Sequence, residues 1–479
     1  MKFNETLNEL MDRYSLRSAD LCRLTGMSRA YASKLRSGSL LPPSFNKISE
    51  IADAIGLTTG DKILLSDAFL YERMNGEYDL ARKLFYDIYT LNISGDKYRP
   101  HSANEAAIFP TNGTLLSGNR ELADVIRKMS ASEDKAILLF FAKENGSQGG
   151  IDELFRTVSK SVSLRWIIPM NETCDADRYN FTFFVNSIPL LCEKPGVAMK
   201  YHANVEGLLK SNVFPFFMVT EKHLLLFGDM QEKGIFFDDP AIISIYTQKF
   251  SDISEHSVGF MNVFDDATAF LNMFSFMPGM QTVSKEKSQI YIFKTNPCIA
   301  VDCSRSEMHR YAAEFENNYE ITEMYMSFLG QLLNSVGKIT AVFTENGLKE
   351  LLEAEEFYEI GKHLSKSFTK EFRFETLRKT IDVSKKEDYI NSHMLRLAGF
   401  ENSDIIGMNV FNSGQFILIY DFEDKYIIVA GYEESITNTV IKYLNDFLRC
   451  DVLYSNEKTC EVMEKALQEA IDKMPADRQ

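Results

Sequence analysis

The sequence predicts an all-α N-terminal segment of five helices, followed by a large α/β (α+β) region with two subdomains. In residues 1–72, apolar residues recur every three or four positions, which is the spacing of amphipathic helices. From about residue 119, short apolar runs alternate with helical patterns, which is typical of α/β layers. The length of 479 residues corresponds to about three domains at roughly 150 residues each. Charged and apolar fractions of 25% and 45% are those of a globular protein.

The five N-terminal helices are short and separated by brief connections. Residues that favour helix starts stand in these connections: Ser18, Ser28, Ser44 and Thr59. Glycines, which readily adopt the left-handed conformation of a helix end, stand where helices would stop: Gly26, Gly38 and Gly56. The start and stop residues and the apolar spacing therefore predict the same five helices.

The remaining residues are predicted to form a linker and two α/β domains. Residues 73–118 form a helical linker and loop, because the helical pattern of 77–91 gives way to prolines and glycines. Residues 119–284 and 285–479 form the two domains, each expected to serve sensing or dimerisation. In the first, strands are predicted at 136–142, 163–169, 197–202, 214–220, 223–227 and 234–237, before a helical region to about 277. In the second, strands are predicted at 289–294, 298–301, 339–344, 415–420, 425–429 and 451–454, with helices at 307–336, 347–356, 436–449 and 458–474.

Residues 18–38 carry the pattern of two helices joined by a tight turn. Gly26 ends the first helix and permits a left-handed turn conformation. Met27 is expected to point inward, and Ser28 is expected to cap the second helix.

Small side chains at Cys22 and Ala32 let these two helices cross closely, and Leu21 and Leu35 fill the contact between them. The second helix therefore presents short or cationic side chains outward: Arg29, Ala30, Ser33 and Lys34. Such groups suit the major groove of DNA, which admits one α-helix.

This segment resembles the Cro/CI-type (lambda-repressor-like, or xenobiotic-response-element) helix-turn-helix family over about residues 3–72. The turn at 26–28 and the Arg-Ser-Gly-x-x-x-Pro ending at 36–42 carry the resemblance. The sequence departs from the family at Ala32, where Ile or Val is usual, and at Cys22, where Ala is usual. Both residues remain small or apolar, so the departures concern packing detail and not the fold.

The resemblance implies a lambda-repressor-like domain that binds double-stranded DNA, with site residues assigned by position. The base-reading residues are Ser28, Arg29, Ala30 and Lys34, with Ser33 on the same helix face. The phosphate-binding residues are Arg17, Ser18, Ser44 and Lys47, with Arg36 as a further cation of the second motif helix. A single domain of this size makes few contacts, so we expect a homodimer on a near-palindromic site.

The distribution of charge favours this interpretation. The formal net charge of −16 by itself argues against a nucleic-acid binder, because Lys and Arg supply the affinity for phosphate. Residues 1–60 nevertheless hold eight cations and six anions, a net of +2, which leaves −18 for the remaining residues. Between Arg13 and Lys47 there are seven cations and one anion. The acidic total therefore conceals a cationic N-terminal segment.

The rest of the sequence lacks familiar motifs of catalysis, cofactor binding or metal binding. No Gly-x-Gly-x-x-Gly, His-Glu-x-x-His, Cys-x-x-Cys or Gly-x-Ser-x-Gly occurs. The order of elements in 119–240 resembles a phospholipase D-type domain, but the His-x-Lys-x4-Asp signature of such an enzyme is absent. His202, His223 and Trp166 are interpreted as ordinary structural residues. We therefore expect no catalytic residues, no cofactor and no metal, and a protein that is not an enzyme.

The compartment follows from two further observations. Apolar runs such as 137–142 and 214–219 are far shorter than the roughly 20 residues that span a membrane. Seven scattered cysteines, an odd number, fit reduced thiols in a cytoplasm. The leading interpretation is a cytoplasmic, sequence-specific transcriptional regulator, bacterial or from a phage, with a small-molecule or peptide effector. The alternative is an enzyme or protein-interaction scaffold whose helix-turn-helix serves autoregulation.

Overall fold

The computed structural model describes residues 2–79, 81–82, 85, 108–139, 162–169, 180, 184, 198–202, 214–228, 233–264, 288–299, 304–310, 323, 326–327, 330, 336–358, 366–386, 389–396, 405–422 and 425–473. The chain forms two compact units, each built from separate stretches of sequence. Unit 1 comprises residues 1–90, 284–407 and 440–479, and unit 2 comprises residues 91–283 and 408–439. The domain boundaries predicted after residues 72, 118 and 284 stay predictions.

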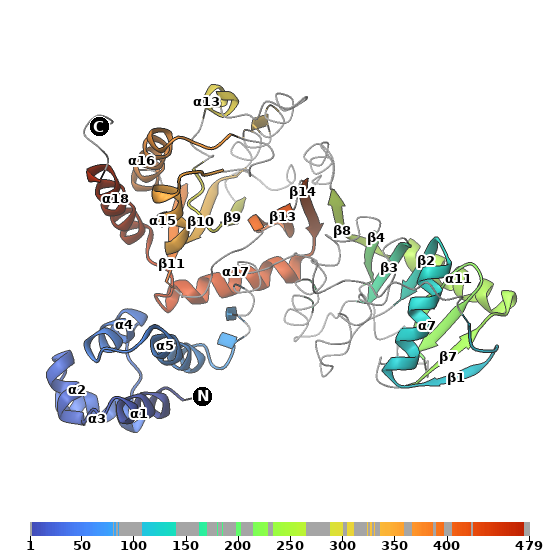
Figure 1. Cartoon of the computed structure of the whole chain (residues 1–479), viewed down its shortest axis with the longest axis horizontal. Helices are drawn as coiled ribbons and strands as arrows, with labels where there is room; N and C mark the ends of the chain where they lie inside the picture. Colours follow the sequence, from blue (N-terminus) through green and yellow to red (C-terminus); the bar gives the residue numbers. More distant parts are fainter. Residues whose placement is uncertain are drawn as a thin grey trace. The chain divides into compact units, whose positions relative to one another are not determined.

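Unit 1 begins with an N-terminal bundle of five helices, which confirms the all-α segment (Figure 1). The helices are α1 (Phe3–Arg13), α2 (Ser18–Thr25), α3 (Arg29–Ser37), α4 (Phe45–Ala54) and α5 (Thr59–Arg73). Apolar residues that recur at helical spacing are buried: Leu7, Leu10, Leu21, Leu35, Ile48, Ile51 and Leu65. Burying a side chain of this size contributes about 1.5–3 kcal/mol. The bundle therefore has a hydrophobic core of its own.

Helices α2 and α5 start at the predicted residues Ser18 and Thr59, and the capping position of each lies one residue earlier. Ser18 is the first residue of α2 and follows Arg17 at the capping position. The cap of α5 is Thr58 and not Thr59. Thr58 occupies the capping position because it lies three residues before Asp61, where its hydroxyl reaches both the backbone N and the carboxylate of Asp61.

The rest of unit 1 is an α/β lobe, here called the parallel lobe. Its strands are β9 (Gln289–Phe293), β10 (Lys338–Thr344) and β11 (Ile390–Leu395), all parallel with β10 in the middle. Its helices are α13 (Arg305–Arg310), α15 (Glu345–Glu353), α16 (Lys370–Lys386), α18 (Asn456–Asp472) and the C-terminal part of α17 (Glu434–Arg449). Helix α16 packs against α18, and both contact β11. Every residue of β10 after the first is buried, as expected for a central parallel strand.

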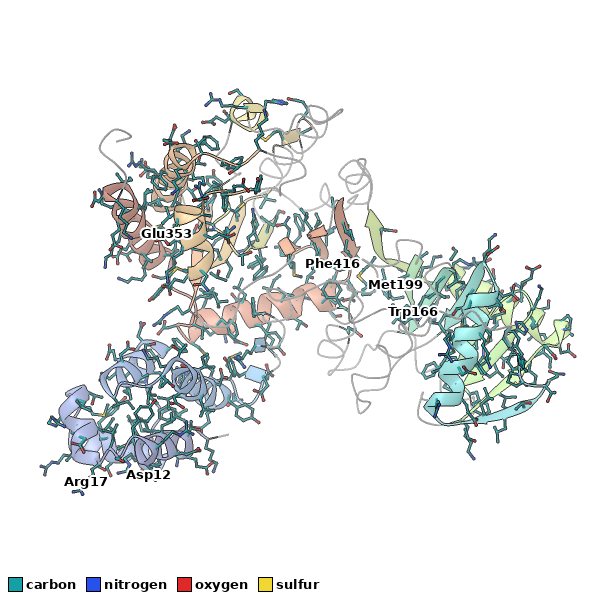
Figure 2. The ribbon with its side chains drawn as sticks, viewed as in Figure 1. Asp12, Arg17, Trp166, Met199, Glu353 and Phe416 are labelled. Atoms are coloured by element: carbon teal, nitrogen blue, oxygen red, sulfur yellow. The ribbon has the colours of Figure 1, made fainter. Side chains whose placement is uncertain are left out.

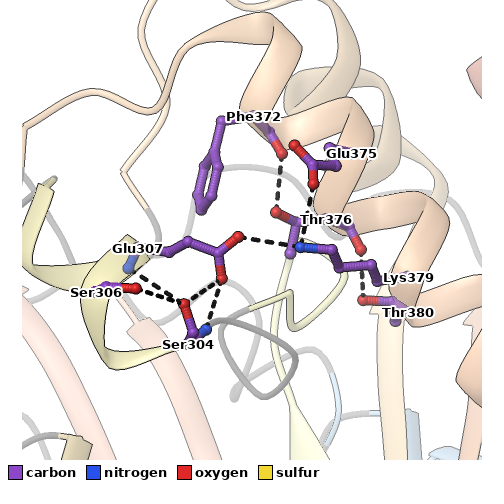
Figure 3. Close-up of polar contacts among 8 residues, drawn as sticks. All are labelled: Ser304, Ser306, Glu307, Phe372, Glu375, Thr376, Lys379 and Thr380. Atoms are coloured by element: carbon purple, nitrogen blue, oxygen red, sulfur yellow. Dashed lines mark hydrogen bonds and ion pairs between the residues drawn. The ribbon is translucent and has the colours of Figure 1, made fainter.

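A polar contact joins α13 to α16 in the parallel lobe (Figure 3). The Glu307 carboxylate accepts hydrogen bonds from Ser304 N at 2.7 Å, from the Ser304 hydroxyl at 2.6 Å and from Lys379 Nζ at 3.0 Å. These donors, with the Ser304 hydroxyl first, lower the pKa of Glu307 to about 2. Ser304 and Glu307 are three residues apart and exchange hydrogen bonds as a capping box does. The contact therefore holds a short helix against a long one.

Unit 2 is built on a mixed sheet with the strand order β1-β7-β6-β5-β2-β3-β4-β8-β14-β13. The strands are β1 (Thr114–Ser117), β2 (Lys135–Leu139), β3 (Ser163–Pro169), β4 (Ala198–His202), β5 (Phe216–Val219), β6 (Leu224–Phe227), β7 (Lys233–Phe237), β8 (Val258–Phe264), β13 (Gln415–Phe422) and β14 (Lys425–Tyr432). Strand β12 (Ile405–Phe411) crosses the boundary between the units. The helices are α7 (Asn119–Ser132) and α11 (Pro240–Glu255).

In the part of unit 2 that the structure describes, helices α7 and α11 pack on this sheet. Ile243, Phe250 and Ile253 of α11 pack on buried residues of β2, β3, β5 and β6. Helix α7 approaches β7 closely, since a Cβ on Gly234 would lie 2.5 Å from Leu122 Cδ2. Trp166 of β3 is 1% exposed and belongs to the core, as the sequence indicates.

Three predicted elements are wrong in detail. The helical region expected to reach about residue 277 is interrupted after α11 by β8, which pairs with β4 and β14, and residues 265–277 lie outside the described residues. Residues 298–299 lie outside any strand. The strand expected at 451–454 is a single bridge between Leu453 and Leu395. Among the helices that the structure describes, none is long and apolar enough to cross a membrane.

Candidate nucleic-acid interface

The turn between α2 and α3 has the predicted geometry. Gly26 has a φ of +70°, and a Cβ there would meet nothing within 4 Å, so glycine is required for its backbone conformation and not for space. Ser28 caps α3, and its hydroxyl accepts a hydrogen bond from Tyr31 N at 3.2 Å. At the other end of α3, Gly38 has a φ of +74° and donates its N–H to Leu35 O.

Helix α3 turns its apolar residues into the bundle and its predicted base-reading residues outward. Ala32 and Leu35 are 1% and 0% exposed. The predicted base-reading residues are all exposed: Ser28, Arg29, Ala30, Ser33 and Lys34. Met27, expected to point inward, is half-buried, and Leu24 of α2 is exposed. The predicted set therefore lies on one accessible face of α3, while its contact with bases stays a prediction.

Arg36, assigned to phosphate binding, is held by other residues of the bundle. Its Nε donates to Asn8 Oδ1 at 2.7 Å, and its Nη1 donates to the Ser18 hydroxyl. Asn8 donates from Nδ2 to Arg36 O at 3.0 Å. Arg36 therefore joins α1, α2 and α3. No sequence pattern indicates Asn8, which lies outside the motif and 28 residues from Arg36.

A cavity of about 600 Å³ opens beside these residues. Its lining residues come from α1, α2 and α3: Asn8, Ser18, Ala19, Cys22, Arg29, Ser33, Arg36 and Ser37. Arg29 and Ser33 are predicted base-reading residues, whereas Ser18 and Arg36 are predicted phosphate-binding residues. The cavity therefore brings members of both sets to one place, with hydroxyl and guanidinium donors along its wall.

The remaining predicted phosphate-binding residues lie at the N-termini of α2 and α4. Arg17 precedes α2 and lies exposed at the periphery of the bundle (Figure 2). Ser44 caps α4 by accepting a hydrogen bond from Lys47 N at 3.4 Å. Lys47 Nζ lies 2.6 Å from the exposed Glu50 carboxylate, a pair of the kind that contributes little to stability. Helix N-termini attract anions through unpaired N–H groups and the helix dipole, so both positions suit phosphate.

The one acidic residue among the motif helices is used within α2. Asp20 accepts hydrogen bonds from Arg17 N at 3.0 Å and from Arg23 Nη2 at 3.1 Å. These bonds, the backbone one first, lower the pKa of the Asp20 carboxyl. In the described part of the chain, no carboxylate forms an ion pair with Arg17, Arg29 or Lys34. Among the described residues, these three exposed cations of the predicted interface are therefore without a carboxylate partner.

Outside the bundle, the described histidines and carboxylates have structural surroundings. In the described ranges, no cluster of three or more His, Cys, Asp or Glu is placed to hold a metal ion. The ring of His223 stacks on Phe109 with centroids 4.0 Å apart, and burial lowers the pKa of this histidine. Its Nδ1 lies 3.7 Å from the buried Glu133 carboxylate. These contacts place His223 within the packing of unit 2.

The helices and the exposed face of α3 define a helix-turn-helix DNA-binding domain. Residues 6–64 match the family model of the Cro/C1-type HTH DNA-binding domain. This match confirms the resemblance that the motif residues indicate, for the N-terminal segment. It ends within α5 and does not extend to the parallel lobe or unit 2.

The solved structures that are similar to this chain include two distant likenesses. One is TrmBL2, an archaeal chromatin protein with a novel mode of DNA binding, at 10% identity and a TM-score of 0.22 over 39% of this chain and 66% of that one. The other is the polyphosphate kinase from Porphyromonas gingivalis, at 9% identity and a TM-score of 0.23 over 69% of this chain and 49% of that one. The chain spans less than two thirds of either protein, and neither likeness indicates a function. No curated protein matches the chain.

Proposed function

We propose that the protein is a sequence-specific DNA-binding transcriptional regulator. The observation that carries the proposal is the exposed face of α3, which presents Arg29 and Lys34 without carboxylate partners in the described ranges. That face belongs to a bundle whose sequence matches a DNA-binding family. An α-helix with short and cationic side chains fits the major groove, where an arginine can bind guanine through two hydrogen bonds.

In this proposal α3 contacts the bases, and the N-termini of α2 and α4 contact phosphates. Arg29 contacts a base edge, and Ser28, Ala30, Ser33 and Lys34 lie along the groove. Arg17, Ser18, Ser44 and Lys47 contact phosphates and so set the register of α3 on the duplex. Arg36 acts mainly inside the bundle, because Asn8 and Ser18 already accept its hydrogen bonds.

The proposal extends to the rest of the chain. Two copies pair on a near-palindromic site, since one bundle makes few contacts. The parallel lobe and unit 2 sense an effector or dimerise, and they do not catalyse. A small-molecule or peptide effector acts by changing how the two bundles are spaced. The protein works in a bacterial or phage-infected cytoplasm.

The test is site selection from a random duplex library with the full chain, at several salt concentrations. We expect the wild-type protein to enrich a defined sequence. We expect Arg29→Ala to lose about 1–3 kcal/mol of discrimination at one base pair while keeping salt-sensitive binding. Lys62→Ala is the matched control, because Lys62 lies on α5 and pairs with Asp53 away from α3. Unchanged specificity of Arg29→Ala would refute the assignment of Arg29, and no DNA binding by the wild type would refute the function.

A further inference from the structure

Arg396, directly after β11, contacts the N-terminal bundle from the parallel lobe. Its guanidinium lies between two aromatic rings, 4.9 Å from the ring centroid of Phe45 on α4 and 4.6 Å from that of Tyr454. Its Nη1 donates to Asn46 Oδ1 at 2.6 Å, and its Nη2 donates to the Ser49 hydroxyl at 3.2 Å. A planar guanidinium can stack and donate at once, which a lysine ammonium cannot do. One side chain of the lobe therefore engages three residues of α4.

The base of this side chain is firmly held. Arg396 N donates to Val452 O at 3.1 Å, and Tyr454 N donates to Met394 O at 3.0 Å. Arg396 Nη1 also donates to Asp451 O at 3.1 Å. These bonds connect the end of β11 to the segment before α18, so the guanidinium and the Tyr454 ring keep a fixed relative position.

A second set of contacts joins the end of the bundle to the same lobe. Phe85, beyond α5, stacks on Phe447 of α17 with centroids 4.8 Å apart and lies 5.6 Å from the ring of Phe293 in β9. Tyr78 is fully buried and lies 6.4 Å from Phe447. Lys442 of α17 pairs with Glu77 at 2.7 Å. Among the described residues, the bundle is thus attached at the first turns of α4 and along the chain after α5.

The Arg396 contact lies beside predicted DNA contacts and leaves α3 open. Asn46 and Ser49 flank Lys47, and Ser44 caps the same helix, so Arg396 holds the helix whose N-terminus is predicted to bind phosphate. Arg29 and Lys34 of α3 stay exposed in this arrangement. Attachment through Arg396 therefore orients the DNA-binding face without covering it.

We propose that Arg396 is a positioning residue for DNA binding, which fixes the direction of α3 relative to the parallel lobe. This inference rests on the proposed function. A bundle attached only through the chain after α5 would sample many orientations, and only a fraction of them would suit a given site. The apparent affinity falls by that fraction. We expect a loss of about tenfold, which corresponds to roughly 1.4 kcal/mol.

The test uses the full chain with three substitutions. Arg396→Met removes the charge and the hydrogen-bond donors but keeps an unbranched side chain between the two rings. Arg396→Lys keeps the charge and loses the planar fork. Arg449→Met is the matched control, because the Arg449 side chain is 76% exposed and pairs only with Asp446 among the described residues. Hydrogen exchange of the α4 amides reports attachment, and binding to duplexes with variably spaced half-sites reports positioning.

We expect Arg396→Met to speed exchange in α4 by about tenfold, while exchange in α1 and in α11 is unchanged. The same variant should bind the preferred duplex about tenfold more weakly and accept more half-site spacings. Arg396→Lys should recover part of both properties, and Arg449→Met should behave as the wild type. Unchanged α4 exchange in Arg396→Met would overturn the attachment. Faster exchange with unchanged affinity and spacing preference would overturn the positioning role. If the wild type binds no DNA, both the proposed function and the positioning role are overturned, whereas the exchange result still reports the attachment separately.

Discussion

Gly38→Ala should destabilise the N-terminal bundle more than Gly26→Ala, because a new Cβ would clash with a neighbouring side chain only at Gly38. Both residues have left-handed backbones, with φ of +74° and +70°. That conformation costs an L-residue roughly 1–2 kcal/mol. A Cβ at Gly26 meets nothing within 4 Å, whereas a Cβ at Gly38 would lie 2.9 Å from Asn4 Cγ. Gly26→Ala therefore measures the backbone cost alone, and Gly38→Ala adds the displacement of the Asn4 side chain.

The magnitude follows from these two terms. We expect Gly26→Ala to lower the stability of the bundle by about 1–2 kcal/mol. Gly38→Ala should lower it by up to about 1 kcal/mol more, which is the low end for overpacking because the Asn4 side chain can rotate away. Asn4→Ala in the Gly38→Ala background should remove the second term and return the loss to that of Gly26→Ala. This double substitution is the control for the clash.

The assay must report the bundle and not the whole chain. Trp166 is the single tryptophan and lies in β3, so tryptophan fluorescence follows unit 2 and should be the same in every variant. Hydrogen exchange of the slowest amides in α1 and α3 reports the opening free energy of the bundle. Equal losses for Gly38→Ala and Gly26→Ala would refute the clash, and no loss in either would refute the backbone cost.

Two further predictions concern side chains that hold helices together. Arg36→Met should destabilise the bundle by about 1–3 kcal/mol in the same exchange assay, because it leaves Asn8 and Ser18 without their donor. If this variant keeps full stability but binds DNA more weakly, Arg36 binds phosphate and does not stabilise the bundle. Glu307→Gln should destabilise unit 1 at neutral pH by roughly 1.5–3 kcal/mol, the range for hydrogen bonds to a charged group. Because the folded pKa of Glu307 is lowered to about 2 from 4.5, its contribution is complete above 4.5 and is lost as the pH falls toward 2. The difference in unfolding free energy between the wild type and Glu307→Gln should shrink over that range, and a difference independent of pH would contradict the contact with Ser304 and Lys379.

The bundle could be predicted from the sequence because its determinants are local. A glycine in a left-handed conformation, a serine three residues before the amide that it caps, and apolar residues at helical spacing are all visible within a few positions. Gly26, Ser28 and Leu35 show this directly, since each has in the structure the role that its neighbours indicate. The exposure of Arg29 and Lys34 follows from the same spacing.

The α/β region was harder to predict because its determinants lie far apart in the chain. The apolar spacing does not predict helix α16, because its buried residues include Arg373, Thr376 and Thr380, which interrupt that spacing. The sequence around β8 predicts a helix, and the segment becomes a strand by pairing with β4 and β14. The same limit applies to the contacts of the bundle, because Asn8 is 28 residues from Arg36, and Asn46 is 350 residues from Arg396.

The structure also shows which cations of the N-terminal segment between Arg13 and Lys47 already have partners within the bundle. Of its seven cations, three form ion pairs within the bundle: Arg13 with Glu9 and Asp61, Arg23 with Asp20, and Lys47 with Glu50. Arg36 is hydrogen-bonded to Asn8 and Ser18, which leaves Arg17, Arg29 and Lys34.

A plot of the logarithm of the DNA-binding constant against the logarithm of the salt concentration has a negative slope. Each phosphate that a cation neutralises makes that slope more negative by about 0.9. If each of the three unpaired cations neutralises one phosphate, the slope is about −2.7 for one bundle and about −5.4 for a pair. A slope near −5.4 for the paired protein would mean that these three residues neutralise the phosphates and that Lys47 stays paired with Glu50, which would remove Lys47 from the proposed phosphate contacts. A much steeper slope would mean that DNA displaces Asp20 and Glu50 from their partners. The salt titration of the site-selection experiment thus distinguishes a preformed cationic face from one that rearranges on the duplex.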